Sequence, residues 1–503
     1  MLELLNSVVA RMRESSGTLH TISQGNRCCF TYPEVFEDVL CARSYLHDLG
    51  LKPGCSIGIL AENCYEWILL DLACLSLGIV LVPFDPKVQE PLEVLINYYD
   101  LDVLFYGRSE KVKHCNAIQL CTFLDHRNSL SEDDVPFFEY SADSVVCMKF
   151  TSGTTSLPKG IPAKAQNIAD CVHVIQDSFH HNADDLILSF LPLYLLQQRY
   201  FIYSSILFDI PLVVVPYLYS FSAIATLHPT VVMAVPHFLE TLIQRYEQAN
   251  TRAEPVGAEL NSEVFTAIFG KRLRYLWTGS APISIDLLIK YEALKIPVYQ
   301  GYGTAETGIL AKNFPGSNRY GSVGRVLPGR KIKISESGEI LARPHAELNT
   351  HYCEGPISNI GQRFLDCDGY FPTGDLGYFD DDGFLYITGR LKSMIVLSSG
   401  RKINPEPIEA AVTSGADIEA CVLFASSAGR LTAVIDSALA EELVAKQIAQ
   451  VNSRLKHEER IGNFLVVRQA FSRESGLRNA QGKIVRNRVY ARFKEKLQEV
   501  GVH

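Results

Sequence analysis

The sequence has no long uninterrupted hydrophobic run and no internal repeat. Its most apolar stretch, residues 202–216, is broken by Asp209 and by two prolines, which argues against a membrane span. The 13 cysteines form no C-x-x-C pair, so we expect reduced core thiols rather than disulfides or zinc ligands. Glu3 and the lack of a small-residue cleavage region argue against a signal peptide. We therefore expect a cytoplasmic protein with no integral membrane segment.

Length and apolar patterning predict the fold class. A chain of 503 residues exceeds what one hydrophobic core usually serves, so we expect at least two domains. Strand-like runs at 56–61, 79–83 and 230–236 alternate with helix-length segments, which predicts an α/β fold with layered, mostly parallel sheets. We place the domain boundary between an N-terminal domain, residues 1–391, and a small mobile α+β domain, residues 392–503.

The charge of the chain excludes some partners. The net charge of −9 gives no reason to expect nucleic acid or an anionic membrane as a partner. The last segment is nevertheless basic, with many arginines and lysines after residue 454. Such a run is commonly a solvated basic face, and it also suits a domain that brings cations to phosphates.

The segment 151–160 has the composition of a phosphate-binding loop. Gly153 and Gly160 free the backbone to turn so that N–H groups can converge on anionic oxygens. Lys159 adds a mobile positive charge, and the loop follows an apolar strand at 145–150. The order Lys159-Gly160 differs from the P-loop pattern, in which lysine follows glycine. The neutral donors of the loop are Thr151, Ser152, Thr154, Thr155 and Ser156. The alternative is a polar surface turn, which such runs often are.

Further motifs follow in a fixed order along the chain: residues 299–307 (YQGYGTAET), 369–377 (GYFPTGDLG), 389–395 (GRLKSMI) and 482–486 (GKIVR). Together with the phosphate loop they resemble the adenylate-forming superfamily of acyl-CoA synthetases, peptide-synthetase adenylation domains and luciferases. The resemblance runs nearly end to end, and several motifs in register make chance similarity very unlikely. It implies ATP-dependent activation of a carboxylic acid, with Mg²⁺ as cofactor.

The resemblance assigns roles to individual residues. Glu306 is implied as the Mg²⁺ ligand and catalytic carboxylate; otherwise it is an acid at a helix N-terminus. Tyr302 is implied to stack on adenine, Asp375 to accept the ribose hydroxyls, and Arg390 to donate to the ribose. A turn aspartate and a surface salt bridge are the alternatives for these last two residues. The segment Gly279–Pro282 resembles the family's loop that lines the acyl and adenine pockets. The predicted ATP-binding set is Thr151, Ser152, Gly153, Thr154, Thr155, Lys159, Gly279, Ser280, Ala281, Pro282, Tyr302, Gly303, Thr304, Asp375 and Arg390.

The resemblance also assigns the C-terminal domain. Lys483 is implied as the catalytic cation of adenylation; a solvated lysine on a turn is the alternative. Lys392 is implied as the hinge between the domains. Gly400 would let a pantetheine arm pass close to the backbone.

Two positions depart from the family pattern. Ala305 stands where the family usually has threonine, with Thr304 one place earlier, and Leu195 stands where it commonly has histidine near the substrate carboxylate. A degenerate, non-catalytic family member is therefore an alternative. The retention of Lys159, Glu306 and Lys483, among others, argues against it.

The segments around 191–200, 229–236, 269–275 and 405–409 look more like the fatty acyl-CoA synthetase branch, which belongs to fatty acid metabolism, than like amino-acid adenylation domains. Residues 232–236 offer no carboxylate for a substrate ammonium group, so an apolar fatty or aryl acid fits better. CoA and a holo acyl carrier protein present the same pantetheine arm. CoA is the expected acceptor, and a standalone ligase loading a carrier protein is the alternative.

Overall fold

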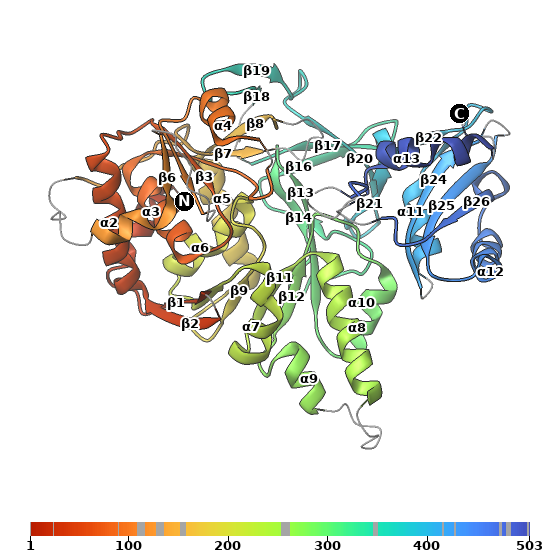
Figure 1. Cartoon of the computed structure of the whole chain (residues 1–503), viewed down its shortest axis with the longest axis horizontal. Coiled ribbons are helices and arrows are strands. Elements are labelled where there is room, and N and C mark those ends of the chain that lie inside the picture. Colours follow the sequence, from red (N-terminus) through yellow and green to blue (C-terminus); the bar gives the residue numbers. More distant parts are fainter. Residues whose placement is uncertain are drawn as a thin grey trace. The chain divides into compact units, whose positions relative to one another are not determined.

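The structure is a computed structural model, and Figure 1 shows the path of the chain. It describes residues 2–23, 25–88, 90–107, 116–126, 135–150, 157–252, 262–345, 351–414, 417–426, 429–471, 475–478, 484–499 and 502. The chain forms two compact units: Met1–Ile283 with Leu287–Ile332 and Ala342–Pro372, and Ser284–Asp286 with Lys333–Leu341 and Thr373–His503. The boundary that we place after residue 391 stays a prediction.

The first unit contains an eight-stranded sheet with parallel strands on one side and antiparallel strands on the other. In sheet order the strands are β19 (Ile360–Arg363), β18 (His351–Cys353), β8 (Gly160–Lys164), β7 (Val145–Phe150), β4 (Val80–Pro83), β3 (Ser56–Leu60), β5 (Val103–Tyr106) and β6 (Ala117–Gln119). Strands β3 to β7 pair in parallel, whereas β7, β8, β18 and β19 pair antiparallel. The strand expected at 145–150 is confirmed as β7.

A nine-stranded sheet forms the other large layer of this unit. In sheet order it holds β15 (Arg325–Val326), β14 (Gly308–Lys312), β13 (Val298–Thr304), β12 (Tyr275–Thr278), β11 (Val231–Ala234), β9 (Ile187–Ser189), β10 (Leu212–Val214), β1 (Thr18–Ser23) and β2 (Asn26–Thr31). The strands from β13 to β1 pair in parallel, and β15, β14 and β2 at the edges run antiparallel. The expected α/β class is therefore confirmed, with mixed sheets.

Helices fill the space between and outside the two sheets. The helices of this unit are α1 (Leu2–Arg11), α2 (Tyr32–Asp48), α3 (Tyr65–Leu77), α4 (Leu92–Tyr99), α5 (Ala165–Phe179), α6 (Leu196–Leu207), α7 (Ser220–Leu227), α8 (Pro236–Arg252), α9 (Ser262–Phe269) and, mainly, α10 (Ile285–Ala293). One apolar cluster joins α1, α2, α3, α5 and α6 to strands of both sheets. Helices α7 to α10 cover the other face of the nine-stranded sheet, and α4 covers the eight-stranded one. The largest core thus lies between the sheets.

Local sequence signals explain where several helices begin and end. Thr31 and Glu34 form a reciprocal capping box at the start of α2, and a proline follows the cap. Helix α3 ends at Gly78, which adopts a left-handed conformation (φ 69°) that suits glycine. Asn404 caps α11 (Pro405–Thr413) by accepting from the Glu406 N–H.

The second unit is built around two small sheets. A four-stranded sheet, mainly in this unit, orders β16 (Lys331–Ile334), β17 (Glu339–Arg343), β20 (Phe371–Phe379) and β21 (Leu385–Arg390). A three-stranded sheet of β24 (Ile418–Ala425), β25 (Leu431–Ser437) and β26 (Ile461–Val467) packs α11 and α12 (Glu441–Asn452) on one face and α13 (Arg486–Glu499) on the other. Strands β22 (Ile395–Val396) and β23 (Lys402–Ile403) form a short hairpin. Strands β20 and β21 form a hairpin whose turn lies at residues 380–384.

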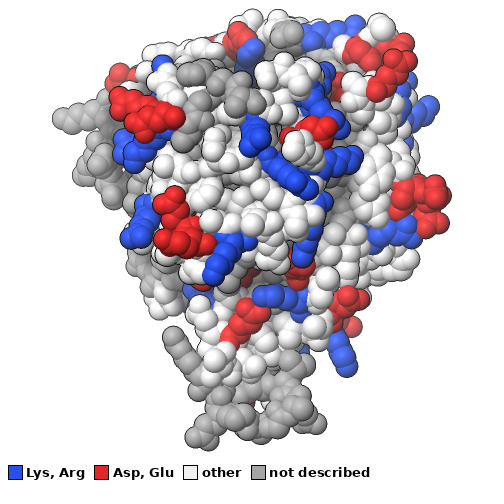
Figure 2. Space-filling view, turned by 90° about the vertical axis from the view of Figure 1, so that its right-hand side faces the viewer, with Lys and Arg blue, Asp and Glu red and all other residues white. Residues whose placement is uncertain are grey.

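Two expectations from composition meet the structure here. No helix in the described part of the chain has the length and apolarity of a membrane span; the stretch 202–216 divides between α6 and β10. Figure 2, which faces the side of the C-terminal unit, shows basic and acidic side chains interspersed. Two arginines of the C-terminal unit are paired: Arg401 lies 2.5 Å from Glu458, and Arg486 lies 2.8 Å from Glu409.

Candidate functional site

The predicted phosphate loop leaves the end of β7. Residues 151–156, and with them the predicted donors Thr151, Ser152, Gly153, Thr154 and Thr155, lie outside the described residues. Lys159 is described: its Nζ lies 2.7 Å from Glu354 Oε1 and 6.0 Å from the centre of the Tyr352 ring. A side chain at Gly160 would collide with the sulfur of Met148, so the return strand β8 requires glycine there.

Glu306 lies in the turn between the antiparallel strands β13 and β14. The Tyr352 hydroxyl donates to Glu306 Oε1 at 2.9 Å. Burial raises the pKa of Tyr352, and the neighbouring charge of Glu306 raises it further, so the tyrosine stays a neutral donor. Our alternative for Glu306, an acid at a helix N-terminus, is wrong because a strand follows it. One carboxylate is a sufficient protein contribution to Mg²⁺, which keeps waters and substrate phosphates as its other ligands.

The strand before Glu306 carries the remaining motif residues. Tyr302 is half-buried, and the β13–β14 register shifts between Tyr302 and Gly303. A side chain at Gly303 would collide with the Gly308 carbonyl, so glycine is required at this bulge. The Thr304 hydroxyl accepts from the N–H of Glu306 at 3.2 Å and of Thr307 at 3.3 Å. This hydroxyl therefore shapes the turn that presents Glu306.

The loop Gly279–Pro282, predicted to line the nucleotide and acyl pockets, begins where β12 ends. Ser280 adopts a left-handed conformation (φ 67°), which turns the chain sharply after the strand. A Cβ at Gly279 would lie 3.1 Å from the carbonyl oxygen of Gly301. The loop and the motif strand are thus close neighbours, with Ala281 and Pro282 following the turn.

The predicted ribose residues face each other in the second unit. Asp375 on β20 is directly opposite Arg390 on β21, and Arg390 Nε lies 3.0 Å from Asp375 Oδ1. The aspartate side chain is 6 % exposed and the arginine side chain 57 %. Thr373 holds the backbone of Asp375 in place, because its hydroxyl donates to the Ile340 carbonyl at 2.8 Å and accepts from the Asp375 N–H at 3.1 Å. The surface salt bridge that we gave as the alternative for Arg390 is present, and its partner is the other predicted ribose residue.

Sequence reasoning missed Glu406, which begins helix α11 beside this pair. Burial raises the pKa of the Glu406 carboxyl, and the charges of Glu409 and Asp375 raise it further, while Arg390 lowers it. The Asn404 side chain donates to the Thr388 carbonyl on β21, which ties the start of α11 to that strand. No sequence signal marks Glu406, because the 3₁₀ turn and the β22–β23 hairpin separate it from Arg390 along the chain.

The remaining predicted residues follow β21. Lys392 lies in a single 3₁₀ turn, Leu391–Ser393, directly after Arg390. Gly400 lies in the turn between β22 and β23 with φ 80°, a conformation that favours glycine. Lys483 lies outside the described residues. Leu195, at the position where a histidine was expected, is the residue before helix α6 and is half-buried.

Comparison with known proteins decides the family. The sequence profile described as AMP-binding enzyme matches residues 11–347, and that of the AMP-binding enzyme C-terminal domain matches residues 392–500. The chain belongs to the AMP-binding enzyme family. It is thus a member of the AMP-forming acid–CoA ligases, as the resemblance of its motifs predicted.

Individual relatives of this AMP-binding enzyme are distant but cover nearly its whole length. It is 24% identical to long-chain-fatty-acid–CoA ligase FadD15 of Mycobacterium bovis, over 93% of this chain and 92% of that protein. It is 25% identical to oxalate–CoA ligase of Arabidopsis thaliana, over 90% and 91% of the two chains.

Solved structures share the fold. O-succinylbenzoate CoA synthetase (MenE) from Bacillus subtilis, in complex with the acyl-adenylate OSB-AMP, has a TM-score of 0.78 at 21% identity, covering 96% of this chain and 97% of that one. ATP-bound MatB from Rhodopseudomonas palustris has a TM-score of 0.78 at 20% identity, covering 98% and 99%.

Proposed function

We propose that this AMP-binding enzyme converts an apolar carboxylic acid, fatty or aryl, into an acyl-adenylate with ATP and Mg²⁺, and then transfers the acyl group to the thiol of CoA. Membership of the family supports the reaction class. The relatives' printed names span long-chain fatty acids, oxalate and 2-succinylbenzoate, so they leave the acid open. The buried strand β11, Val231–Ala234, carries only apolar side chains and supports an uncharged acyl body.

The observation that carries the proposal is the group of Lys159, Glu306, Tyr352 and Glu354 in the first unit. Adenylation requires a carboxylate for Mg²⁺ and a cation for the polyphosphate. Tyr352 orients Glu306 through a 2.9 Å hydrogen bond and lies beneath Lys159. Lys159 is 43 % exposed, so its ammonium group can turn from Glu354 toward a bound phosphate. These contacts support Glu306 as the metal ligand and Lys159 as the phosphate contact.

In the second unit we assign Asp375 and Arg390 to the ribose, Lys392 to the hinge and Lys483 to the transition state of adenylation. The buried Asp375 carboxylate next to a mostly exposed arginine supports this assignment, since a diol needs an acceptor that is already fixed in place. Gly400, whose turn presents bare backbone, is our candidate for the passage of the pantetheine arm.

The test is acid-dependent exchange of pyrophosphate into ATP, over a panel of fatty, aryl and amino acids, followed by thioester formation with CoA or with holo carrier protein. We expect exchange with apolar acids and thioester with CoA. Thioester with carrier protein alone would instead identify a carrier-loading ligase. No exchange with any acid, in protein shown to be folded, would favour a non-catalytic family member.

A pair of variants tests the assigned ribose contact. Asp375→Asn should raise the KM for ATP by about 10-fold or more, because a charged hydrogen-bond acceptor is lost. Asp382→Asn, in the exposed turn of the same hairpin, is the matched control and should leave that KM unchanged. Equal values for the two variants would leave Asp375, a strand residue in the structure, with only its structural role as partner of Arg390.

A further inference from the structure

Strand β14 ends in a lysine that the proposed chemistry does not use. Lys312 is 0 % exposed, and among the described residues its Nζ atom has no hydrogen-bond partner. Buried ammonium or amine groups are almost always hydrogen-bonded or paired, since burial without a partner is costly. An unpartnered amine at this depth therefore calls for a specific explanation.

Aromatic rings enclose this amine. Lys312 Nζ lies 4.3 Å from the ring centre of Phe179 and 4.9 Å from that of Trp277. Phe179 in turn stacks on Tyr275, with ring centres 4.7 Å apart, and packs near Tyr299 at 5.7 Å. The flat faces of these rings attract a cation, but they carry no oxygen or nitrogen atom that could accept a hydrogen bond from it.

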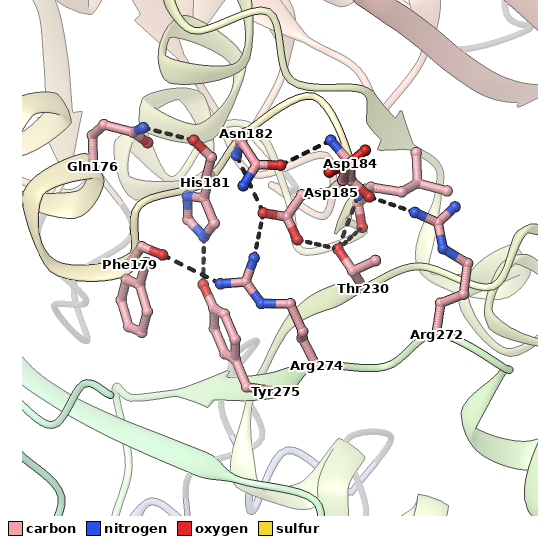
Figure 3. A network of polar contacts seen from close by, with 11 residues as sticks. Gln176, Phe179, His181, Asn182, Asp184, Asp185, Thr230, Arg272, Arg274 and Tyr275 are labelled. Atoms are coloured by element: carbon pink, nitrogen blue, oxygen red, sulfur yellow. Dashed lines mark hydrogen bonds and ion pairs between the residues drawn. The ribbon is translucent and has the colours of Figure 1, made fainter. Parts of the chain in front are cut away.

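The walls of this enclosure are held rigidly. Figure 3 shows that the Phe179 carbonyl accepts from Arg274, at 3.3 Å, and that Arg274 is fixed by Asp185 at 2.5 Å. Tyr275 is held from the other side by the ring nitrogen of His181. Polar contacts thus anchor the Phe179 backbone and the Tyr275 ring. These two residues form a preorganised surface.

The charged groups near Lys312 do not stabilise a positive charge on its amine. Burial lowers the pKa of Lys312, Arg330 lowers it further, and the thiol of Cys171 opposes the shift. Asp170, the carboxylate next to Arg330, is already occupied by Arg330 and by His345, the latter at 2.9 Å. His181 is neutral in this setting, since burial lowers its pKa to about 4. Among the residues that the structure describes, no carboxylate pairs with the amine.

The position of Lys312 connects it to the proposed site. It pairs with Gly301, and Ala311 pairs with Tyr302, so Lys312 and Tyr302 project from opposite faces of the same two-stranded segment. A Cβ at Gly301 would lie 3.4 Å from Lys312 Cβ and 3.2 Å from Trp277 Nε1. Gly301 also adjoins Gly279, at the start of the loop assigned to the acyl pocket. The Gly301 position of β13 thus lies between Lys312 and that loop, and Lys312 projects from the face away from the assigned adenine contact.

We propose that Lys312 binds a second carboxylate, carried at the end of the acid remote from the one that is adenylated. The inference rests on the proposed function and narrows the acid to an apolar body with a distal anion. A carboxylate would supply the acceptors that the amine lacks, and in a dry aromatic enclosure the resulting ion pair would be strong. The rings of Phe179 and Trp277 would pack against the apolar body. Binding would protonate the amine, so proton uptake should accompany it.

The experiment compares acids in matched pairs: a monocarboxylate and the dicarboxylate of equal carbon number, in an aliphatic and in an aryl series. Pyrophosphate exchange gives kcat/KM for each. Wild-type enzyme should prefer the dicarboxylate, and Lys312→Met should reduce that preference by about 10- to 100-fold, mainly through KM. Lys312→Gln, which keeps donors but no charge, should reduce it as well and serves if the methionine variant folds poorly. Lys52→Met, at an exposed lysine, is the control and should keep the wild-type ratio.

Calorimetry provides a readout other than turnover. Titration of the preferred dicarboxylate in two buffers of different ionisation enthalpy should reveal proton uptake in wild type and none in Lys312→Met. Exchange with monocarboxylates alone, or an unchanged ratio in Lys312→Met, would overturn the role of Lys312 and leave adenylation standing. No exchange with any acid would refute adenylation, and this inference with it.

Discussion

Replacing Asp71 by asparagine should markedly destabilise the first unit. Asp71 and Arg199 form an ion pair at 2.9 Å, with side chains 3 % and 0 % exposed, and the Tyr203 hydroxyl donates to the second carboxylate oxygen at 2.9 Å. Asparagine keeps the shape but leaves the arginine charge buried without a counter-charge. Breaking a buried pair in this way costs about 3–5 kcal/mol. For a domain of several hundred residues, that is a fall in Tm of about 4–8 °C.

The same structure predicts the behaviour of a double variant. Burial raises the pKa of Asp71, while Arg199 and Tyr203 lower it, so the ion pair does not fully offset the cost of burying the carboxylate. Replacing both members by apolar residues of similar size, Asp71→Leu with Arg199→Met, should therefore recover most of the lost stability.

Thermal unfolding, followed by circular dichroism at one protein concentration, measures both effects. Asp177→Asn is the matched control: this aspartate is 58 % exposed on α5 and pairs with His173, so its loss should change stability by less than about 0.5 kcal/mol. If Asp71→Asn melts together with the control, or if the double variant melts below the single one, the reasoning about the buried pair is wrong.

Glu306→Gln should slow pyrophosphate exchange by about 10²-fold or more with little change in Tm, because one anionic Mg²⁺ ligand is lost; wild-type turnover would contradict this. Lys483→Ala should lower acid-dependent ATP consumption by about 10²- to 10³-fold yet still form thioester from preformed acyl-adenylate, and equal loss in both assays would make Lys483 structural. Lys392→Pro should cripple one half-reaction and spare the other, measured in the same two assays, since proline fixes φ at the hinge. Burial lowers the pKa of His181 to about 4, so the unfolded chain binds a proton at this residue more readily than the folded chain does. The free energy of unfolding should therefore be highest above about pH 6.5 and fall by about 3 kcal/mol as the pH approaches 4. This would be refuted if a His181→Gln variant showed the same pH slope as wild type in urea unfolding.

Much of the fold could be predicted because its signals are local. The strands expected at 56–61, 79–83 and 230–236 are β3, β4 and β11. Glycine positions were equally informative: Gly303 and Gly160 each lie where a side chain would collide with a neighbouring strand. Such residues are recognisable because their constraint is encoded at one position.

The partners of these residues could not be predicted, because they depend on long-range pairing. Tyr352 contacts Glu306 across 46 positions of sequence, and no periodicity marks a tyrosine for that role. Lys312 was overlooked for a related reason: a lysine at the end of a strand is ordinarily exposed, and only the packing of Phe179 and Trp277 buries it. A helix start was the alternative for Glu306, because a carboxylate near Gly and Thr suits a helix start as well as a tight turn.

Both tryptophans of the chain lie beside a buried basic side chain. Trp277 is 4.9 Å from Lys312 Nζ, and Trp67 is 5.7 Å from the guanidinium carbon of Arg199. Indole emission responds to charge close to its ring, so the protein carries an intrinsic optical reporter at each site. In a Trp67→Phe background, the fluorescence of Trp277 alone would follow the protonation of Lys312 in real time and without any added label.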